Sequence, residues 1–147
     1  MNIKSILENI RCSAAAPTPK VLANEHYVYL IFFVEDSSVQ DAENSPFNRV
    51  PIDQICSIRF NKYAKYQFSA FEVDDISNHD YSELGLEPYL FQEVVDSDWI
   101  DPSNNTGIHI IIPMKDSCFE VVCKSFTLME DTCQTMREEV LRLAELV

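Results

Sequence analysis

The stretch YVYLIFFV, residues 27–34, places the strongest constraint on how this chain of 147 residues can fold. It is rich in β-branched and aromatic side chains and has the length of a β-strand. A strand with one face in water would alternate polar and apolar residues, whereas this stretch is apolar throughout. We therefore expect residues 27–34 to form a central strand of a sheet.

Strand signals recur along the rest of the chain, and turn-forming segments separate them. The clearest is a hairpin with arms at 108–114 and 118–126, joined by a short KDS turn. Pro113, near the end of the first arm, favours an edge strand or a strand end at that point. Besides the hairpin, we expect one or two strands within 54–73 and another at 89–95. The intervening loops are expected at 36–48, 78–88 and 96–107.

Apolar residues spaced as on one face of a helix predict a helix at each end of the chain. In the N-terminal segment 2–11, such residues precede a proline-rich stretch. Near the C-terminus, Thr127 and Glu130 form a capping-box pattern. The apolar seam expected of that helix consists of Met129, Cys133, Met136, Val140, Leu143 and Val147. The sequence thus predicts a single α+β domain spanning 1–147, an antiparallel β-sheet with an N-terminal and a C-terminal helix packed on it.

The chain carries a large excess of negative charge. Its 24 Asp and Glu residues outnumber its 11 Lys and Arg residues, for a formal net charge of −13. From Gln67 to Met114 there is no Lys or Arg, although nine carboxylates fall within residues 73–101. Such a charge distribution repels nucleic acids and anionic lipids and attracts basic proteins. We therefore expect a basic protein as the partner, with no nucleic acid and no membrane.

Several classes of chemistry lack their usual signature. The chain has two glycines and no glycine-rich phosphate-binding motif, so we expect no nucleotide cofactor. The segment DSDWID offers carboxylates at the spacing of a calcium loop. The sixth and twelfth positions of that loop are nevertheless Asp101 and Gly107, where a Gly and a Glu are needed. We therefore expect no cofactor, no metal and no enzymatic activity.

The cysteines and the N-terminus indicate a cytoplasmic protein. The number of cysteines is odd and no C-x-x-C occurs, which favours core thiols over a metal or redox site. The N-terminal segment lacks the apolar region of a secretory signal, and no apolar run is long enough to span a bilayer. The five cysteines are Cys12, Cys56, Cys118, Cys123 and Cys133.

The histidines offer one alternative to a pure binding protein. His26 and His109 lie in apolar strand segments, where we expect them to be hydrogen-bonded sheet residues. His79 lies in a polar loop beside Asp80, a setting that would suit a general base or a pH-sensitive contact. The alternative function is therefore a small enzyme or ligand-binding protein with a cleft around His79.

Two segments, HDYSELGLEPYLFQEVVDSDWI and IHIIIPMKDSCFEVVCKSF, resemble a group of small, largely uncharacterised bacterial proteins. That group combines a G-L-E-x-Y segment and an E-V-x-x-S-x-W segment with a hairpin strand ending in D-S-x-F-E. Where the group has a His before its D-S, this chain has Lys115. The resemblance implies the hairpin and a bacterial origin, and it implies no particular activity. The matching positions are His79, Tyr81, Gly85, Leu86, Glu87, Tyr89, Glu93, Val94, Trp99, Asp116, Ser117, Phe119 and Glu120.

Taken together, these patterns favour an acidic protein-binding inhibitor, most concretely a bacterial immunity protein that neutralises a basic, nuclease-type toxin. A phage-encoded anti-defence inhibitor would use the same electrostatics. A solvated surface that serves only solubility is the remaining interpretation. An inhibitor should gather its carboxylates on one face, with aromatic anchors between them. The expected partner-binding residues are Asp74, Asp75, Asp80, Tyr81, Glu83, Glu87, Tyr89, Asp96, Asp98, Trp99 and Asp101.

Overall fold

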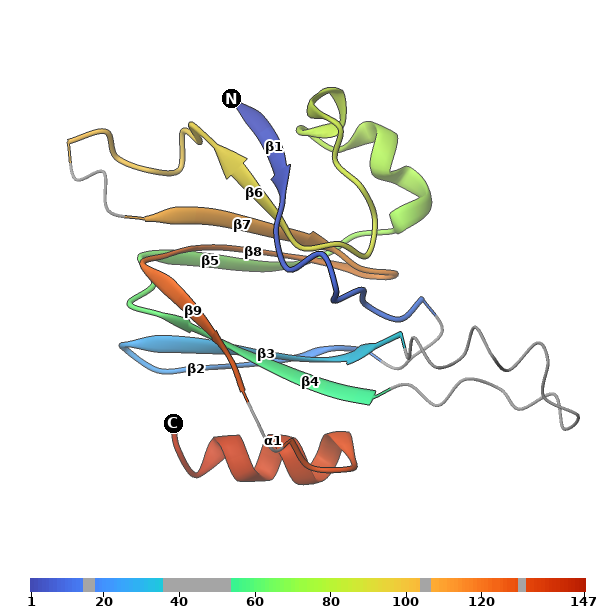
Figure 1. Cartoon of the computed structure of the whole chain (residues 1–147), viewed down its shortest axis with the longest axis vertical. Helices are drawn as coiled ribbons and strands as arrows, with labels where there is room; N and C mark the ends of the chain where they lie inside the picture. The colour runs from blue at the N-terminus through green and yellow to red at the C-terminus, as the bar shows by residue number, and fades with distance from the viewer. Residues whose placement is uncertain (15–17, 36–53, 104–106, 130–131) are drawn as a thin grey trace, which may run out of the picture.

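Two antiparallel β-sheets stack face to face in the computed structural model, and one α-helix lies on the outside of the second sheet (Figure 1). The structure describes residues 1–14, 18–35, 54–103, 107–129 and 132–147. The strand order is β1-β6-β7-β8-β5 in the first sheet and β2-β3-β4-β9 in the second.

The strands are short, as is usual for twisted antiparallel sheets. The first sheet consists of β1 (Asn2–Ser5), β5 (Lys65–Ala70), β6 (Gln92–Val95), β7 (Ile108–Pro113) and β8 (Ser117–Cys123). The second consists of β2 (Lys20–Ala23), β3 (Tyr27–Val34), β4 (Gln54–Asn61) and β9 (Ser125–Leu128).

The apolar run at 27–34 forms β3, and its predicted central position is confirmed. It lies between β2 and β4 and pairs with β4 along its whole length. Alternate side chains such as Leu30 pack between the two sheets. Tyr29 and Ile31 point the other way, into a cluster with the helix. Both faces of β3 are therefore covered, which explains why the run shows no polar alternation.

The main core lies between the sheets. Phe32 packs against Phe91 with ring centroids 5.3 Å apart, and Phe60 packs against Phe119 at 5.4 Å. Every residue of β8 is buried. Because successive side chains of a strand point to opposite faces, the first sheet must also be covered on its outer face.

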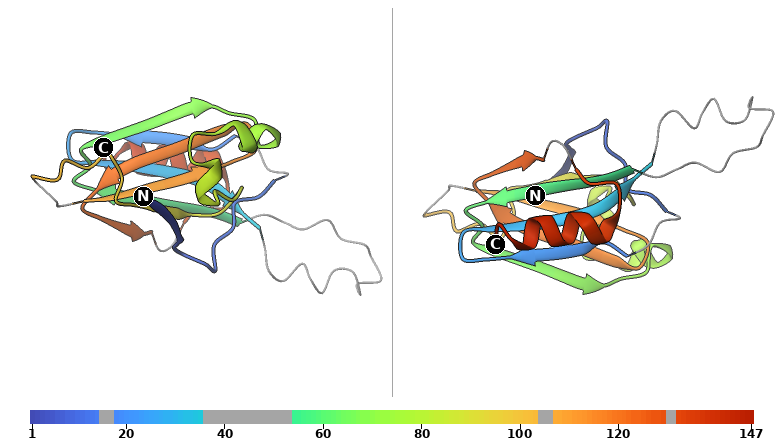
Figure 2. Two further views of the ribbon diagram at one scale, coloured as in Figure 1. Left: turned by 90° about the horizontal axis from the view of Figure 1, so that it is seen from above. Right: turned by 90° about the horizontal axis from the view of Figure 1, so that it is seen from below.

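That outer cover comes from the chain on either side of β6. Two short 3-10 helices, η2 (Val73–Asn78) and η3 (Ser82–Leu84), lie over the first sheet together with the loop that follows β6 (Figures 1 and 2). We call residues 73–88 and 96–103 the covering layer. Seen from below, the helix lies across the opposite side of the molecule, on the second sheet (Figure 2).

The predicted α+β class is wrong, because the described residues are mostly antiparallel β-sheet with a single α-helix. The segment 2–11 contains β1 and an irregular turn instead of a helix. Its apolar residues serve two separate clusters: Ile3 packs on the outer face of the first sheet, whereas Ile6 and Ile10 pack against the core between the sheets. A short isolated helix gains little from its own hydrogen bonds, whereas β1 gains a full register against β6.

The C-terminal helix α1 (Met136–Ala144) is confirmed, but it begins later than predicted. Thr127 lies in β9, so the capping-box pattern does not start a helix, and Glu130 lies outside the described residues. The N-cap is Thr135, whose hydroxyl accepts the backbone N–H of Glu138. Val147 of the predicted seam is exposed. The seam residues that pack on the second sheet are Met129, Met136, Val140 and Leu143.

Other predicted elements hold with adjusted bounds. The hairpin is confirmed as β7 and β8. Pro113 ends β7, which is an interior strand, so the strand-end alternative is correct and the edge alternative is wrong. The segment 54–73 contains β4 and β5, whereas the loop predicted at 36–48 lies outside the described residues. In the part of the chain that the structure describes, no helix is long and apolar enough to cross a membrane.

Leu143 is the main anchor of α1 on the second sheet, since its side chain is fully buried against Tyr29, Ile31 and Ile55. We expect Leu143→Ala to lower the free energy of unfolding by about 2–5 kcal/mol, because it leaves a cavity. Leu141→Ala, on the exposed side of the same helix, should change it by less than about 0.5 kcal/mol. Urea unfolding followed by circular dichroism compares the two; equal losses would contradict the packing of α1.

Candidate functional site

The outer face of the first sheet carries buried polar and ionisable side chains, which is unusual for a sheet face. Cys118 and Glu120 occupy alternate positions of β8 and therefore point the same way, and His109 comes from the neighbouring strand β7. All three are buried. The covering layer closes over them. We call the whole set the outer cluster: His79, Tyr81, Ser97, Trp99, His109, Cys118 and Glu120.

Ser97, His109 and Glu120 form a chain of hydrogen bonds. Ser97 Oγ lies 2.6 Å from His109 Nδ1, and His109 Nε2 lies 3.0 Å from Glu120 Oε1. Ser97 Oγ also accepts the backbone N–H of Trp99 at 3.0 Å. With the ring proton on Nε2, the serine hydroxyl donates to Nδ1 and the ring donates to the carboxylate. Ser97 Oγ and both ring nitrogens of His109 then have partners, as their burial requires.

Aromatic rings enclose the imidazole of His109. Trp99 stacks on it with centroids 4.4 Å apart and an interplanar angle of 10°. Tyr81 meets it edge-on at 5.9 Å. The ammonium of Lys65 on β5 lies 3.8 Å from the centre of the Trp99 ring, a cation–π contact. Three interactions thus hold Trp99 in place: its backbone N–H donates to Ser97, and its ring stacks on His109 and contacts the ammonium of Lys65.

The order Ser–His–Glu is that of a hydrolytic triad, but its accessibility does not suit catalysis. A nucleophilic serine and its base must be reachable by a substrate. Here Ser97 is 6% exposed and His109 is 0% exposed, with Trp99 lying over the ring. The chain of hydrogen bonds therefore acts as a structural network that ties the loop after β6 to β7 and β8.

A second grouping inside the outer cluster joins His79, Cys118 and Glu120. A ring nitrogen, the thiol sulfur and a carboxylate oxygen all lie within 4.8 Å of one another. His79 is half-buried between η2 and η3, and its Nδ1 accepts the backbone N–H of Tyr81 at 3.1 Å. Burial, and to a lesser extent the charge of Glu120, raises the pKa of the Cys118 thiol to about 12. Burial is also the main cause that raises the pKa of Tyr81 to about 12.

This grouping changes how His79 is interpreted. The sequence placed Asp80 beside it, but Asp80 is exposed and Glu120, 41 positions away along the chain, is the carboxylate that His79 approaches. An open depression does adjoin His79, lined also by Phe71, Glu72 and Asp75. His26 lies in the turn between β2 and β3, and so it is not a sheet residue. The prediction for His109 as a hydrogen-bonded sheet residue is confirmed.

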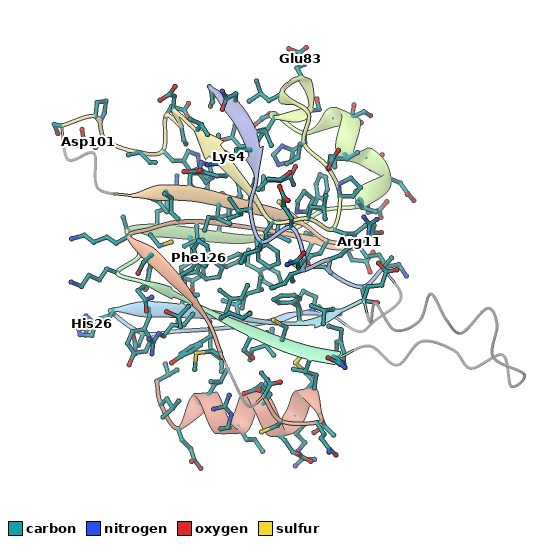
Figure 3. All side chains as sticks on the ribbon, viewed as in Figure 1. Lys4, Arg11, His26, Glu83, Asp101 and Phe126 are labelled. Carbon is teal, nitrogen blue, oxygen red and sulfur yellow. The ribbon has the colours of Figure 1, made fainter. Side chains whose placement is uncertain are left out.

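The predicted carboxylates lie on the outer side of the covering layer, and all eight are exposed. Glu83 and Asp101 both project from the end of the molecule opposite α1 (Figure 3). The ion pairs within 4.0 Å among the described residues include none of the eight. Lys4 of β1 lies at the same end (Figure 3). The exposed set is Asp74, Asp75, Asp80, Glu83, Glu87, Asp96, Asp98 and Asp101.

The predicted aromatic anchors are less accessible than the carboxylates. The expectation of an exposed ring is wrong for Tyr81, which is 8% exposed and packs beneath the covering layer with Leu86. Trp99 and Tyr89 are half-buried, and the guanidinium of Arg11 lies 5.7 Å from the centre of the Tyr89 ring. The accessible surface of the layer is therefore dominated by carboxylates, with part of the Trp99 ring, while part of the Tyr89 ring is accessible next to the layer.

Sequence reasoning missed Ser97, Cys118 and Glu120 as members of a site. The hairpin register did contain a signal, because positions 109, 118 and 120 fall on one face of the predicted sheet. Ser97 occupies the S of the E-V-x-x-S-x-W segment. The sequence did not predict that the covering layer would enclose that face.

Ser97→Ala tests whether the hydrogen-bond network holds the covering layer. It leaves His109 Nδ1 and the Trp99 amide without their partner, so we expect a loss of about 1–3 kcal/mol in the free energy of unfolding. Ser77→Ala, at an exposed position of η2, is the matched control and should change it by less than about 0.5 kcal/mol. Trp99, the only tryptophan, reports unfolding by fluorescence. A neutral Ser97→Ala would show that the network contributes nothing.

Comparison of the chain with protein-family models, with curated protein sequences and with solved structures gave no match. The two sequence segments 79–100 and 108–126 contain all seven residues of the outer cluster.

Proposed function

We propose that this protein is an acidic inhibitor that binds a basic protein through the outer side of the covering layer. The most concrete form of the proposal is a bacterial immunity protein that neutralises a basic, nuclease-type toxin. The observation that carries it is the set of eight exposed carboxylates on one layer, none of them in an ion pair among the described residues.

Clustered carboxylates without ion-pair partners repel one another and so destabilise the folded state. A functional role in binding would explain why they are present. Carboxylates placed for solubility are usually interspersed with Lys and Arg, which relieves their mutual repulsion. Here the nearby cation Lys65 contacts Trp99 instead. Clustered like charges raise the local potential, and this potential speeds the encounter with an oppositely charged protein.

The covering layer also supplies a fixed platform for these charges. The loop after β6 is tied down through Ser97 and the stacked Trp99. The segment between η2 and η3 is tied down through Tyr81, which packs on the sheet face with Ile111 and Val94. A surface that is ordered before it meets its partner loses less conformational entropy on binding.

The alternative of an enzyme or ligand-binding protein with a cleft around His79 draws on the depression beside that residue. The ring of His79 is occupied, however, by the Tyr81 amide at Nδ1 and by an edge contact with Phe71 at 5.5 Å. A phage-encoded inhibitor of a basic nuclease would use the same acidic layer, and the identity of the captured partner distinguishes it from an immunity protein.

Charge reversal on the acidic layer should weaken partner capture. We compare Asp80→Lys/Glu83→Lys with a matched double variant, Glu25→Lys/Glu145→Lys, whose exposed positions lie outside the layer and give the same change in net charge. Immobilised protein is exposed to a lysate of the bacterium that encodes it, at stepped salt concentrations. We expect wild type and the matched variant to retain a basic protein at about one-to-one ratio, and the layer variant to release it at lower salt.

Kinetics with the purified partner then test the mechanism. The association rate constant of the layer variant should fall at least about ten-fold at low ionic strength, with a flatter salt dependence, while its unfolding free energy stays within about 0.5 kcal/mol of wild type. Equal rates for the two double variants would exclude this face. A captured partner whose activity is unaffected by saturating protein would overturn the inhibitor proposal.

A further inference from the structure

We propose that His79, Cys118 and Glu120 form a binding site for a single Zn²⁺ ion beneath the covering layer. This departs from the expectation of no metal, which was based on sequence spacing alone. The three ligands come from separate parts of the chain, so no metal-binding spacing is visible in the sequence. The inference is independent of the proposed inhibitor function, because it concerns the inner side of the layer rather than its carboxylates.

The donor atoms select the metal. An imidazole nitrogen, a sulfur and a carboxylate oxygen are the three kinds of ligand that Zn²⁺ takes in proteins. Ca²⁺ and Mg²⁺ prefer oxygen ligands throughout, so the thiol and the imidazole disfavour them. Three protein ligands leave the fourth tetrahedral position for a water molecule.

The distances are close to those that a metal requires. Tetrahedral zinc with bonds of about 2.0–2.3 Å separates its ligand atoms by roughly 3.3–3.8 Å. The three candidate atoms lie within 4.8 Å of one another, so the approach that metal binding requires is at most about 1.5 Å. Cys118 and Glu120 are fixed two positions apart on β8, and His79 lies outside the strands. The adjustment therefore falls on the segment that carries His79.

A hydrogen bond from a neighbouring side chain fixes the Glu120 carboxylate. His109 holds its Oε1 at 3.0 Å, which leaves Oε2 for a metal. The imidazole of His109 is fixed in turn by Ser97 and by the stacked ring of Trp99. A hydrogen-bonded partner that orients a metal-ligating carboxylate is typical of metal sites. His109 and Ser97 are therefore positioning residues in this proposal, not ligands.

Metal binding must also break one contact. The Nδ1 atom of His79 accepts the amide of Tyr81 at 3.1 Å. If zinc binds Nδ1, it replaces that amide. If it binds Nε2, the ring proton moves to Nδ1, which can then no longer accept. In both cases the Tyr81 amide loses its partner, and this loss gives a local signal of binding through His79.

The test uses the full chain, freed of metal with a chelator and titrated with Co²⁺ as a spectroscopic substitute for Zn²⁺. We expect saturation at one equivalent, a thiolate-to-metal charge-transfer band and the strong visible absorption of tetrahedral cobalt, all abolished by added Zn²⁺. The Tyr81 amide resonance should shift in the same titration. A hundred-fold excess of Zn²⁺ over its Kd should raise Tm by roughly 5–10 °C, since the ion binds only the folded chain.

Variants separate this site from other cation binding. Cys118→Ser should abolish the charge-transfer band, and His79→Gln and Glu120→Gln should each weaken Co²⁺ binding at least ten-fold. Cys123→Ser is the matched control, because Cys123 is a buried thiol of the same strand on its opposite face. His26→Gln is the control for an exposed histidine. Both controls should bind as wild type does, and circular dichroism confirms that each variant is folded.

Two results would overturn the proposal. The first is a titration with no thiolate band in the wild-type chain. The second is binding that persists unchanged in Cys118→Ser and is matched by Ca²⁺, because exposed carboxylates alone would then account for it. Either result leaves the inhibitor proposal untouched, since partner capture is tested at Asp80 and Glu83, which are not among the three proposed metal ligands.

Discussion

The complete burial of β8 is the constraint on which the rest of the structure depends. One face of this strand packs Phe119 against the second sheet, and the other presents Cys118 and Glu120 to the covering layer. A buried carboxylate is expensive unless it is hydrogen-bonded, so Glu120 needs His109, and the buried imidazole needs Ser97. The aromatic cover and the polar network thus follow from one requirement, the closure of the outer face of the first sheet.

The closure of the outer face of the first sheet explains why polar side chains lie on the outer side of the covering layer. It does not explain why these side chains are negatively charged. A layer that buries Tyr81 and Leu86 on its inner side has to place polar side chains on its outer side. Any polar residue would satisfy that condition. Eight carboxylates without a single ion pair among the described residues weaken the folded state by mutual repulsion. Folding therefore does not require these side chains to be negatively charged, and for this reason we propose that the charge serves binding.

The sequence predicted those elements whose pattern depends on one strand or one hairpin. The uninterrupted run that became β3 and the alternating arms of β7 and β8 are examples. The failures at both ends have a common cause. Thr127 and the residues around Ile3 carry helix-like patterns, but each pairs with a strand distant in the sequence. The outer cluster was missed for the same reason: His79 meets Cys118, and Ser97 meets His109, only after the sheet and its cover have formed.

The two proposals rest on different observations, and together they would affect different steps in the binding of a basic partner. In the proposed function, the carboxylates act at a distance, so they would change how fast a basic partner arrives. A zinc ion held by His79, Cys118 and Glu120 would link the segment between η2 and η3 to β8. It would leave the eight exposed carboxylates in place and reduce the freedom of the segment that carries Asp80 and Glu83. Since ordering a surface beforehand lowers the entropy lost on binding, metal occupancy should lengthen the lifetime of the complex and leave its salt-dependent association rate nearly the same.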